Sequence, residues 1–431
     1  MTDSLAGAPF TTQDVTDAYI YILGRFLVVR QETIDLSEDG VDYNVLKHNR
    51  AVGAAMREGM APTFVNPNLD TVYSEAWIAV DEDTPALLTI PSIPAELYYT
   101  AQIVDEWAEI THNVNERNFP AHPSGRFAVC LAGSTPDIPA GALRIDIPSR
   151  KAKLLTRVQI GDDLERAVAL QHGFGVASAG SARIEPTVPI EQFTNRALPG
   201  AEIFDQPVLD EALAATDVCP KAAEMHPLLR RISEYIAAGA AQHSAVEQIV
   251  LTRSLPALNH FMTSFGYHVN GWSSTAQYEK FGADYYFRAA ANFGGIWWNS
   301  ALEAVYLMAH TGTDGAPLTG DKSYTVTFAA NELPSSAQNC FWSLTVLSKP
   351  DYMLVANPAH RYAVNGYTDL RYNSDGSLTL YLAVDRPAGA PAENWLPVPA
   401  DRDFTATLRL YLPTEAVRRG QWSPGPLTVA G

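Results

Sequence analysis

The order in which hydrophobic periodicity changes along the chain constrains the fold more than any other feature of the sequence. Residues 63–160, and the stretch from about 320 to the end, hold many short runs in which apolar and polar residues alternate, as in β-strands. Between them, residues 221–310 carry apolar residues at the three- and four-residue spacing of helices. The sequence therefore predicts a mixed α+β protein with a helical segment between two strand-rich regions.

The chain is predicted to open with a helix. Thr11 or Thr12 can cap its first turn, and Asp14 follows within that turn. Apolar residues then recur at spacings of four, three, four and three, as a helix with one buried face requires. These residues are Val15, Tyr19, Ile22, Phe26 and Val29.

The strand predicted over residues 71–80 has two different faces. Val72 and Ile78 lie on the side expected to face a core, whereas Tyr73, Glu75 and Trp77 lie on the other side. That second side is expected to face a cavity or solvent.

The C-terminal region reads as many short antiparallel strands separated by turns, which favours a jelly-roll-like β-sandwich. The segment 284–309 is expected to form a long apolar helix, or a broken pair with its break at Gly294 and Gly295. The predicted domains are 1–180 (α+β), 181–283 (irregular and helical connection) and 284–431 (helix plus sandwich).

Charge and composition narrow the class of partner. Lys plus Arg number 30 against 48 Asp plus Glu, a net charge of −18, which argues against nucleic acid and anionic membranes as partners. The most apolar stretch, 20–29, is too short to span a bilayer, and the N-terminus lacks the features of a signal peptide. Three widely spaced cysteines fit free thiols in a reducing compartment. A cytoplasmic protein that takes a small molecule as its partner is expected, and assembly into a homo-oligomer is left open.

Short motifs that would identify a cofactor or a reaction are missing from the sequence. It contains no GxGxxG following a strand, no GxxxxGK[ST], no HExxH and no GxSxG. No cofactor and no metal are therefore predicted.

Two carboxylates are candidates for acid/base chemistry. Asp70 ends the polar turn "NPNLD", and Asp105 ends the predicted strand "YYTAQIVD". If these strands are neighbours, both carboxylates could approach one sheet end. The alternative is that Asp70 forms a turn and Asp105 terminates a strand. The accompanying candidates are Tyr73 and Tyr99 as proton donors, and Asn68, Thr71 and Gln102 as substrate-binding groups.

Tryptophans in the C-terminal half provide a second candidate site. Trp342, Asn394 and Trp395 could line a groove for a carbohydrate or an apolar ligand. The alternative is that the tryptophans fill a core and that Asn394 holds a loop in place.

Several blocks of the chain, in this order, resemble a bacterial two-domain family whose halves are known only as domains of unknown function 1254 and 1214. The N-terminal blocks are "NPNLDTVYSEAWIAVD", "LYYTAQIVDEW" and "IPSRKAKLLTRVQIGDDLERAVALQ". The C-terminal blocks include "FRAAANFGGIWWNSALEAVY", "FWSLTVLS", "FTATLRLYLP" and "GQWSPGP". The resemblance implies an α+β region joined to a jelly-roll-like sandwich, and it implies no reaction. Leu69 stands where the family has a second amide.

Three functions follow as hypotheses. The first is a cofactor-independent enzyme that performs hydrolysis, elimination or isomerisation on a small neutral or cationic molecule. Anionic substrates fit it less well, unless Arg157 or Arg288 turns inward. The second is a non-catalytic protein that binds a small ligand or a carbohydrate. The third is a metal-dependent hydrolase using His112, His122, Asp105 and Asp70.

Overall fold

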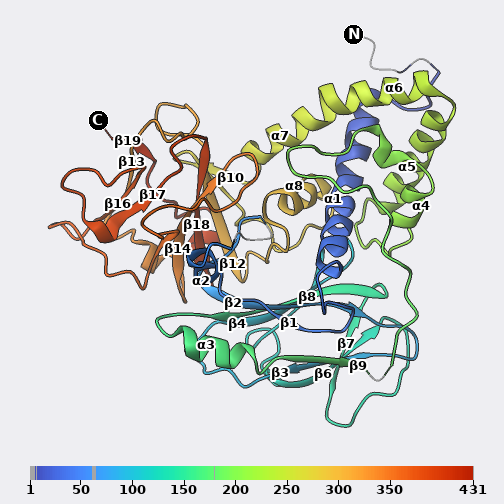
Figure 1. The fold of residues 1–431 in the computed structure, drawn as a ribbon, viewed down its shortest axis with the longest axis horizontal. Helices are drawn as coiled ribbons and strands as arrows, with labels where there is room; N and C mark the ends of the chain where they lie inside the picture. The colour runs from blue at the N-terminus through green and yellow to red at the C-terminus, as the bar shows by residue number, and fades with distance from the viewer. Residues whose placement is uncertain (1–4, 6, 61–64, 179, 431) are drawn as a thin grey trace.

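The chain folds into three parts that meet at the centre of the molecule (Figure 1). The computed structural model describes residue 5 and residues 7–60, 65–178 and 180–430. Two N-terminal sheets lie at the bottom of the view, a helical region at the upper right, and the C-terminal sheets at the left. The protein is thus mixed α+β with a helical middle segment, as the change in periodicity predicted.

The N-terminal part consists of two stacked sheets. Residues such as Val72, Ile78, Leu88 and Phe127 fill the core between them, so the predicted core face of the strand 71–80 is confirmed. The five-stranded sheet has the order β1-β2-β8-β4-β5: β1 (Lys47–His48), β2 (Thr71–Ala79), β8 (Lys151–Gln159), β4 (Tyr99–Val104) and β5 (Ile110–Val114). The four-stranded sheet has the order β7-β6-β3-β9: β7 (Leu143–Ile147), β6 (Gly125–Leu131), β3 (Ala86–Ile90) and β9 (Gly175–Ser178). Two short helices accompany them, α2 (Val52–Arg57) and α3 (Leu164–Gln171).

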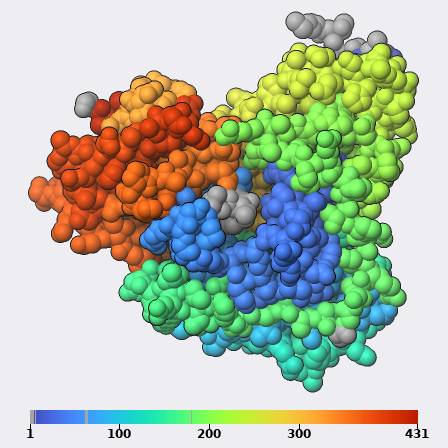
Figure 2. Space-filling view, viewed as in Figure 1, coloured from blue at the N-terminus to red at the C-terminus, as the bar shows by residue number. Residues whose placement is uncertain are grey.

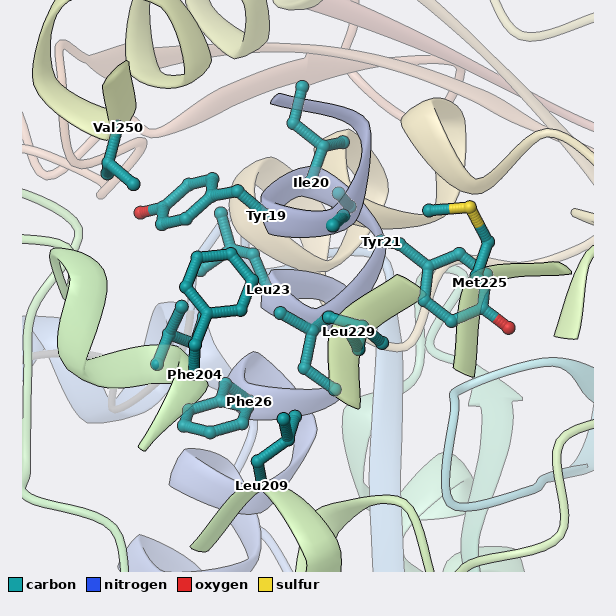
Figure 3. Close-up of a cluster of buried hydrophobic side chains, with 14 of the residues drawn as sticks. Tyr19, Ile20, Tyr21, Leu23, Phe26, Phe204, Leu209, Met225, Leu229 and Val250 are labelled. Carbon is teal, nitrogen blue, oxygen red and sulfur yellow. The ribbon is translucent and has the colours of Figure 1, made fainter. Parts of the chain in front are cut away.

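Helix α1 (Thr12–Leu36) runs through the helical region and is buried on almost every side. Its predicted N-terminus is confirmed by a capping box, in which Thr11 and Asp14 bond to each other's backbone N–H groups. Figure 3 shows Tyr19, Leu23 and Phe26 packed against side chains of the surrounding helices. Those helices are η1 (Ala201–Phe204), α4 (Val208–Ala212), α5 (Ala222–Ala237), α6 (Ala240–Ile249), η2 (Val250–Ser254), α7 (Leu255–Ser264) and α8 (Tyr285–Gly295).

The C-terminal part also has two sheets around one core. In the six-stranded sheet, β18 (Phe404–Tyr411) lies between β12 (Ala304–Ala309) and β14 (Trp342–Ser348), and the sheet continues through β11 (Trp272–Ser274), β10 (Tyr267–Val269) and β15 (Ala363–Asn365). The four-stranded sheet has the order β17-β16-β13-β19: β17 (Trp395–Pro397), β16 (Leu378–Ala383), β13 (Tyr324–Phe328) and β19 (Thr428–Val429). Short helical turns η3 (Pro334–Ser336), η4 (Ala392–Asn394) and α9 (Glu415–Arg418) lie in the connections.

The prediction of a long helix or helix pair over 284–309 is wrong in its second half. Helix α8 ends at Gly295, at the predicted break, but β12 then forms as a strand. The apolar segment that forms β12 could also form a turn of helix. It instead pairs with β18 along its whole length, and this tertiary pairing overrides local propensity. The hairpin of β10 and β11 likewise interrupts the region expected to be helical.

Among the residues that the structure describes, no helix combines the length and the apolar character that crossing a membrane would need.

Candidate functional site

A cavity of about 80 Å³ lies where the three parts of the chain meet. It is bounded by one face of the five-stranded N-terminal sheet, one face of the six-stranded C-terminal sheet, and α8 with the segment that follows it. This volume holds several water-sized molecules or a small ligand. Figure 2 shows the three parts closing around the middle of the molecule. Its polar lining is Asn49, Asn66, Asn68, Tyr73, Glu75, Arg157, Thr275, Tyr306, Tyr352 and Arg409.

The N-terminal wall of the cavity is set by the register of three strands. Tyr73 on β2 lies directly opposite Arg157 on β8, so both side chains leave the sheet on the same face. The guanidinium carbon of Arg157 is 5.2 Å from the centre of the Tyr73 ring, and Arg157 Nε donates to Tyr73 Oη at 3.4 Å. Arg157 also donates to Gln102 Oε1 at 2.6 Å and to the carbonyl oxygen of Trp297 at 2.9 Å. The predicted cavity-facing side of β2 is therefore confirmed at Tyr73.

The C-terminal wall contributes a second buried arginine. Arg409 on β18 lies opposite Tyr306 on β12, and both residues line the cavity. Arg409 donates through Nη1 to Thr345 Oγ1 at 2.7 Å, and through Nη2 to the carbonyl and side-chain oxygens of Asn66. Its Nε has no hydrogen-bond partner among the described residues.

Glu75 is the carboxylate of the cavity wall, and it shares the ammonium group of Lys153 with Asp35. Its Oε2 lies 2.7 Å from Lys153 Nζ, and its Oε1 accepts a hydrogen bond from Asn49. Burial by itself raises the pKa of Glu75, but the charge of Lys153 and these hydrogen bonds outweigh burial and bring the pKa below its usual value. Glu75 is therefore ionised at neutral pH and is a weak proton acceptor.

Aromatic and aliphatic groups complete the cavity. Helix α8 ends in Gly294 and Gly295, and the next residues, Trp297 and Trp298, line the cavity beside them. Trp297 adopts a left-handed backbone conformation with φ of 64°, which a bulky residue rarely takes. The remaining apolar lining is Val65, Leu155, Met262, Phe265, Phe287, Ala290, Ala291, Ile296 and Met308.

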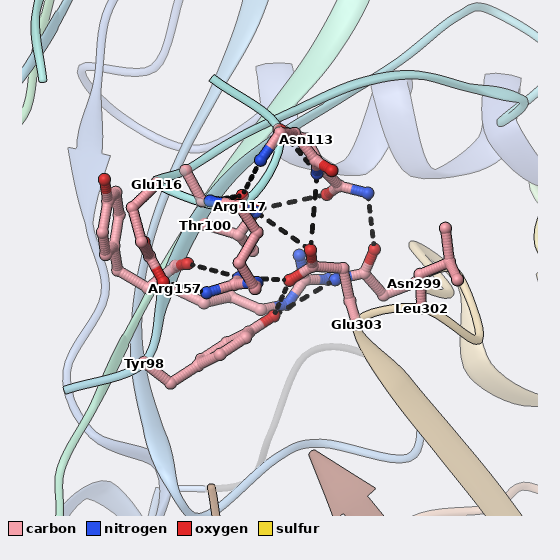
Figure 4. A network of polar contacts seen from close by, with 12 residues as sticks. Tyr98, Thr100, Asn113, Glu116, Arg117, Arg157, Asn299, Leu302 and Glu303 are labelled. Atoms are coloured by element: carbon pink, nitrogen blue, oxygen red, sulfur yellow. Dashed lines mark hydrogen bonds and ion pairs between the residues drawn. The ribbon is translucent and has the colours of Figure 1, made fainter. Parts of the chain in front are cut away.

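A buried polar network holds the two walls together next to the cavity (Figure 4). Glu303 lies just before β12, and its side chain is 3% exposed. It accepts hydrogen bonds from Tyr98 Oη at 3.0 Å and Asn115 Nδ2 at 3.0 Å, and its Oε2 is 2.6 Å from Arg117 Nη2. The N-terminal and C-terminal sheets are thus bridged by a charge-assisted network, which fixes the distance between the cavity walls.

The expected pairing of Asp70 with Asp105 is wrong. Strand β8 lies between β2 and β4 and is antiparallel to both, so β2 and β4 run parallel. Asp70 precedes β2 and bonds to Ile160, whereas Asp105 follows β4 beyond the level of Lys153. At about 3.3 Å per residue, the seven residues from Lys153 to Ile160 place the two aspartates roughly 23 Å apart along the strand direction.

Each of the two aspartates has a separate environment, and neither lines the cavity. Asp70 Oδ1 accepts from Asn365 Nδ2 at 2.9 Å, and burial raises the pKa of Asp70. Asp105 Oδ1 accepts from the backbone N–H groups of Trp107 and Glu109 just after β4 ends, which fits the strand-terminating role given as its alternative. Burial raises the pKa of Asp105 to about 7.

The other candidates of the N-terminal half fall on different sides of the sheet. Asn68 lines the cavity, and its Oδ1 accepts from the backbone N–H of Asp70 at 2.7 Å. Gln102 supports the cavity wall through Arg157 and through the carbonyl oxygen of Trp298. Tyr99 lies on the opposite, core-facing side and donates to the carbonyl oxygen of Pro123. Thr71 is buried at the start of β2 and is not part of the cavity lining.

The prediction that Trp342, Asn394 and Trp395 line a ligand groove in the C-terminal half is wrong. Trp342 is buried in the core between the C-terminal sheets. Asn394 bonds to backbone groups of Arg371 and Thr379, the loop-holding role given as its alternative. Trp395 donates to the carbonyl oxygen of Ala383. Trp297 and Trp298 of "IWWNS", which follow the end of α8, line the central cavity instead.

The four residues of the metal hypothesis do not converge. His122 Nε2 contacts the carbonyl oxygen of Arg126, and His112 is half-buried in a different environment. Asp70 and Asp105 are at opposite ends of the sheet, as described above. Within the described ranges of the chain, no group of three or more His, Cys, Asp or Glu side chains is arranged to hold a metal ion.

Sequence reasoning missed Arg409 as a site residue. The alternation of "FTATLRLYLP" placed Ala406, Leu408 and Leu410 on one face, and all three are in the core. Arg409 is on the other face. A charged residue in the middle of an apolar strand indicates a buried polar site, because charged residues are rarely buried without a partner.

Comparisons with known proteins identify the class to which the chain belongs. Residues 43–178 match the family model DUF1254, and residues 303–415 match the family model DUF1214; each is described as a protein of unknown function. The chain therefore belongs to the family of proteins that join these two domains, as its sequence blocks predicted.

Two solved structures are similar to the chain. One is the VPA0106 protein from Vibrio parahaemolyticus, with a TM-score of 0.61 and 17% identity, covering 97% of this chain and 100% of that one. This likeness supports the fold. The other is an uncharacterized protein from Burkholderia cenocepacia, with a TM-score of 0.44 and 16% identity, covering 100% and 91% of the two chains. No curated protein matches the chain.

Proposed function

We propose that the protein is an enzyme that performs acid/base chemistry on a small molecule bound in the cavity, with Tyr73 as the group that transfers the proton. The observation that carries this proposal is the contact between Tyr73 and the guanidinium of Arg157 inside a mainly apolar cavity. The proposal retains the cofactor-independent acid/base reaction expected from the sequence and moves it from the two aspartates to the tyrosine.

The chemistry follows from the neighbours of Tyr73. A phenolic hydroxyl can donate a proton, and the guanidinium of Arg157 lies beside the hydroxyl of Tyr73. Tyr73 can therefore donate a proton to an oxygen that gains negative charge, while Arg157 stabilises the charge that develops. The apolar lining excludes bulk water and so strengthens both interactions. Hydrolysis, elimination and isomerisation all contain such a step.

Replacing Tyr73 tests the proposal. The protein is incubated with a panel of small esters, amides, hydroxy acids and unsaturated acids, and their consumption is followed by proton NMR. We expect the wild-type protein to consume at least one compound and Tyr73→Phe to lower that rate by about 100-fold or more, the usual contribution of a proton-transfer group. Tyr99→Phe is the matched control, because Tyr99 lies on the opposite side of the same sheet.

A Tyr73→Phe variant with an unchanged rate would contradict the proposal, and so would consumption that depends equally on Tyr99. Binding affinity for the consumed compound should change only a few-fold in Tyr73→Phe, because the phenyl ring still fills its place in the cavity wall.

A second candidate is a small-molecule-binding protein without chemistry. It is favoured by the mainly apolar lining, and by the pairing of Glu75 with Lys153, which leaves the cavity wall without a strong base. It predicts that compounds bind in the cavity and that none is consumed. The jelly-roll arrangement expected of the C-terminal half stays a prediction, and both candidates need only the central strands of its larger sheet.

A further inference from the structure

The cavity receives one buried guanidinium from the central strand of each of its two walls. Arg157 is 4% exposed and Arg409 is 0% exposed. Arginine stays protonated in proteins, so both side chains carry a full positive charge. A buried charge is costly unless an opposite charge balances it.

Neither guanidinium is balanced by direct contact with a carboxylate. Within the part of the chain that the structure describes, Arg157 and Arg409 take part in no ion pair within 4.0 Å. The acceptors of Arg157 are Gln102, Trp297 and Tyr73, and the side-chain acceptors of Arg409 are those of Thr345 and Asn66. All of these acceptors are neutral groups.

The cavity wall also carries hydrogen-bond donors without a partner among the described residues. A guanidinium carries five N–H groups, whereas Arg157 makes three hydrogen bonds to the described residues. Two lining residues have buried side-chain atoms without a partner, namely Arg409 at Nε and Trp298 at Nε1, and both of these atoms are donors. A ligand that complements such a wall must supply acceptors.

We infer that the molecule bound in the cavity is a small apolar monoanion, a carboxylate or an equivalent acid, whose charged end lies between Arg157 and Arg409. This inference rests on the proposed function, because it names the substrate class of the same cavity. Its apolar part lies along Phe265, Phe287, Trp297 and Trp298. The charged end faces the two arginines and not Glu75, whose carboxylate is bound by Asn49 and by Lys153, which also pairs with Asp35.

A surface cleft of about 820 Å³ lies beside the cavity. Met262 and Tyr352 line both the cavity and the cleft, so the two spaces share a wall. The cleft is also lined by Arg196, Lys349 and Arg402. Two of these cations are already paired, Arg196 with Asp351 and Arg402 with Asp401, which also lines the cleft.

Compounds that share one skeleton and differ in charge test the inference on the wild-type protein. Benzoate, benzamide and benzylamine are titrated by calorimetry and by quenching of tryptophan fluorescence, with butyrate and butyramide as a smaller pair. We expect each acid to bind at least ten-fold more tightly than its amide, and benzylamine to bind more weakly than either aromatic partner. Equal affinity for benzoate and benzamide, preference for benzylamine, or no binding of either acid overturns the inference.

Arginine variants locate the anion. Arg157→Lys and Arg409→Lys should each lower the affinity for benzoate at least ten-fold, because lysine cannot reproduce the planar arrangement of N–H donors of a guanidinium. Arg25→Lys is the matched control, since Arg25 is equally buried but pairs with Glu106 away from the cavity. Circular dichroism confirms that each variant is folded. Unchanged benzoate affinity in folded variants of both Arg157 and Arg409 overturns the inference.

The outcome separates this inference from the proposed function. If neutral compounds are bound and consumed with dependence on Tyr73, the proposed function stands and only the anionic class is wrong. If benzoate binds as expected but Tyr73→Phe leaves every rate unchanged, the anion site stands and the acid/base role is wrong.

Discussion

Two groups of buried arginines in this protein have opposite kinds of partner. In the helical region, Arg25 lies 3.2 Å from Glu106, and Arg288 lies 3.5 Å from Asp217, so each positive charge has a carboxylate of its own. At the cavity, Arg157 and Arg409 contact neutral oxygens. The charges of Arg25 and Arg288 are balanced by direct contact within the chain. Arg157 and Arg409 directly contact neutral groups only, as Arg30 does through Asn195, and the charge of Arg409 acts at longer range on the buried carboxylate of Asp70.

The comparison explains why Arg288 does not serve the site, although the sequence left open that either Arg157 or Arg288 turns inward. The guanidinium carbon of Arg288 lies 4.6 Å from the ring centres of both Tyr21 and Trp107. Burial raises the pKa of Asp217, but its hydrogen bond with His226 and the charge of Arg288 lower it below its usual value. Arg288 is therefore bound to an ionised partner and is not available to a ligand.

The largest effect is expected when a paired arginine is removed. Arg288→Met leaves Asp217 buried without its guanidinium, which costs about 3–5 kcal/mol of unfolding free energy. Arg157→Met leaves only neutral acceptors behind and should cost less than about 2 kcal/mol. Urea denaturation of both variants measures the difference. An equal or larger loss in Arg157→Met would contradict the distinction between the two groups.

Asp105, which lies in the region of the paired arginines, is expected to change the free energy of unfolding by about 2–4 kcal/mol as pH changes. The pKa of Asp105 is about 7 in the folded protein, above the usual 3.8. Between pH 3.8 and about 7 the folded state therefore binds a proton that the unfolded state has released. Stability therefore falls as pH rises from about 4 to about 7. Asp105→Asn should be more stable than wild type at pH 8, and the difference should vanish near pH 4.

Thermal denaturation across this pH range measures the effect, with the exposed Asp137→Asn as a control that should follow the wild-type curve. A constant difference between Asp105→Asn and wild type at all pH values would show that the carboxyl of Asp105 does not titrate in this window.

A smaller loss of stability is expected when the polar network that joins the cavity walls is altered. Glu303→Gln keeps the shape of the side chain but removes the charge that Arg117 contacts, and should cost about 1–3 kcal/mol. Because the walls are less firmly held, benzoate binding should also weaken. Calorimetry on the folded variant checks this, and an unchanged affinity would show that the network stabilises the fold without shaping the cavity.

The smallest change concerns the size of the cavity. A methyl group at Gly295 would lie 3.6 Å from Asn66 Nδ2, an ordinary contact, so Gly295→Ala is expected to stabilise the fold by up to about 0.5 kcal/mol. The methyl group should also reduce the room for a ligand and shift the preference from benzoate toward butyrate. If the preference for benzoate is unchanged, Gly295 does not limit the ligand.

Alternation within single strands allowed much of the fold to be predicted. The faces of β2 and β18 were assigned correctly because burial on one side forces a period of two, and the polar faces of these strands carry Tyr73 and Arg409. The family resemblance was confirmed by the two matching domains.

The assembly of the site could not be predicted in the same way. The expected pairing of Asp70 and Asp105 needed β2 and β4 to be antiparallel neighbours, but β8, which begins only at Lys151, inserts between them. The cavity joins residues as distant in sequence as Tyr73 and Arg409, and only the docking of the two sheets brings them to one space. The segment around Trp297 lines the cavity because it connects the end of α8 to strand β12 of the C-terminal sheet.

The most direct test of the account is a crystal structure of the protein grown with benzoate, beside one grown with benzamide at the same concentration. The account predicts benzoate in the cavity, with its carboxylate within hydrogen-bond distance of the Arg157 and Arg409 guanidinium groups and its ring against Trp297 and Trp298. It also predicts a lower occupancy of benzamide there. A cavity that is empty in the benzoate crystal, or that holds the ring with the carboxylate directed away from both arginines, would contradict the account.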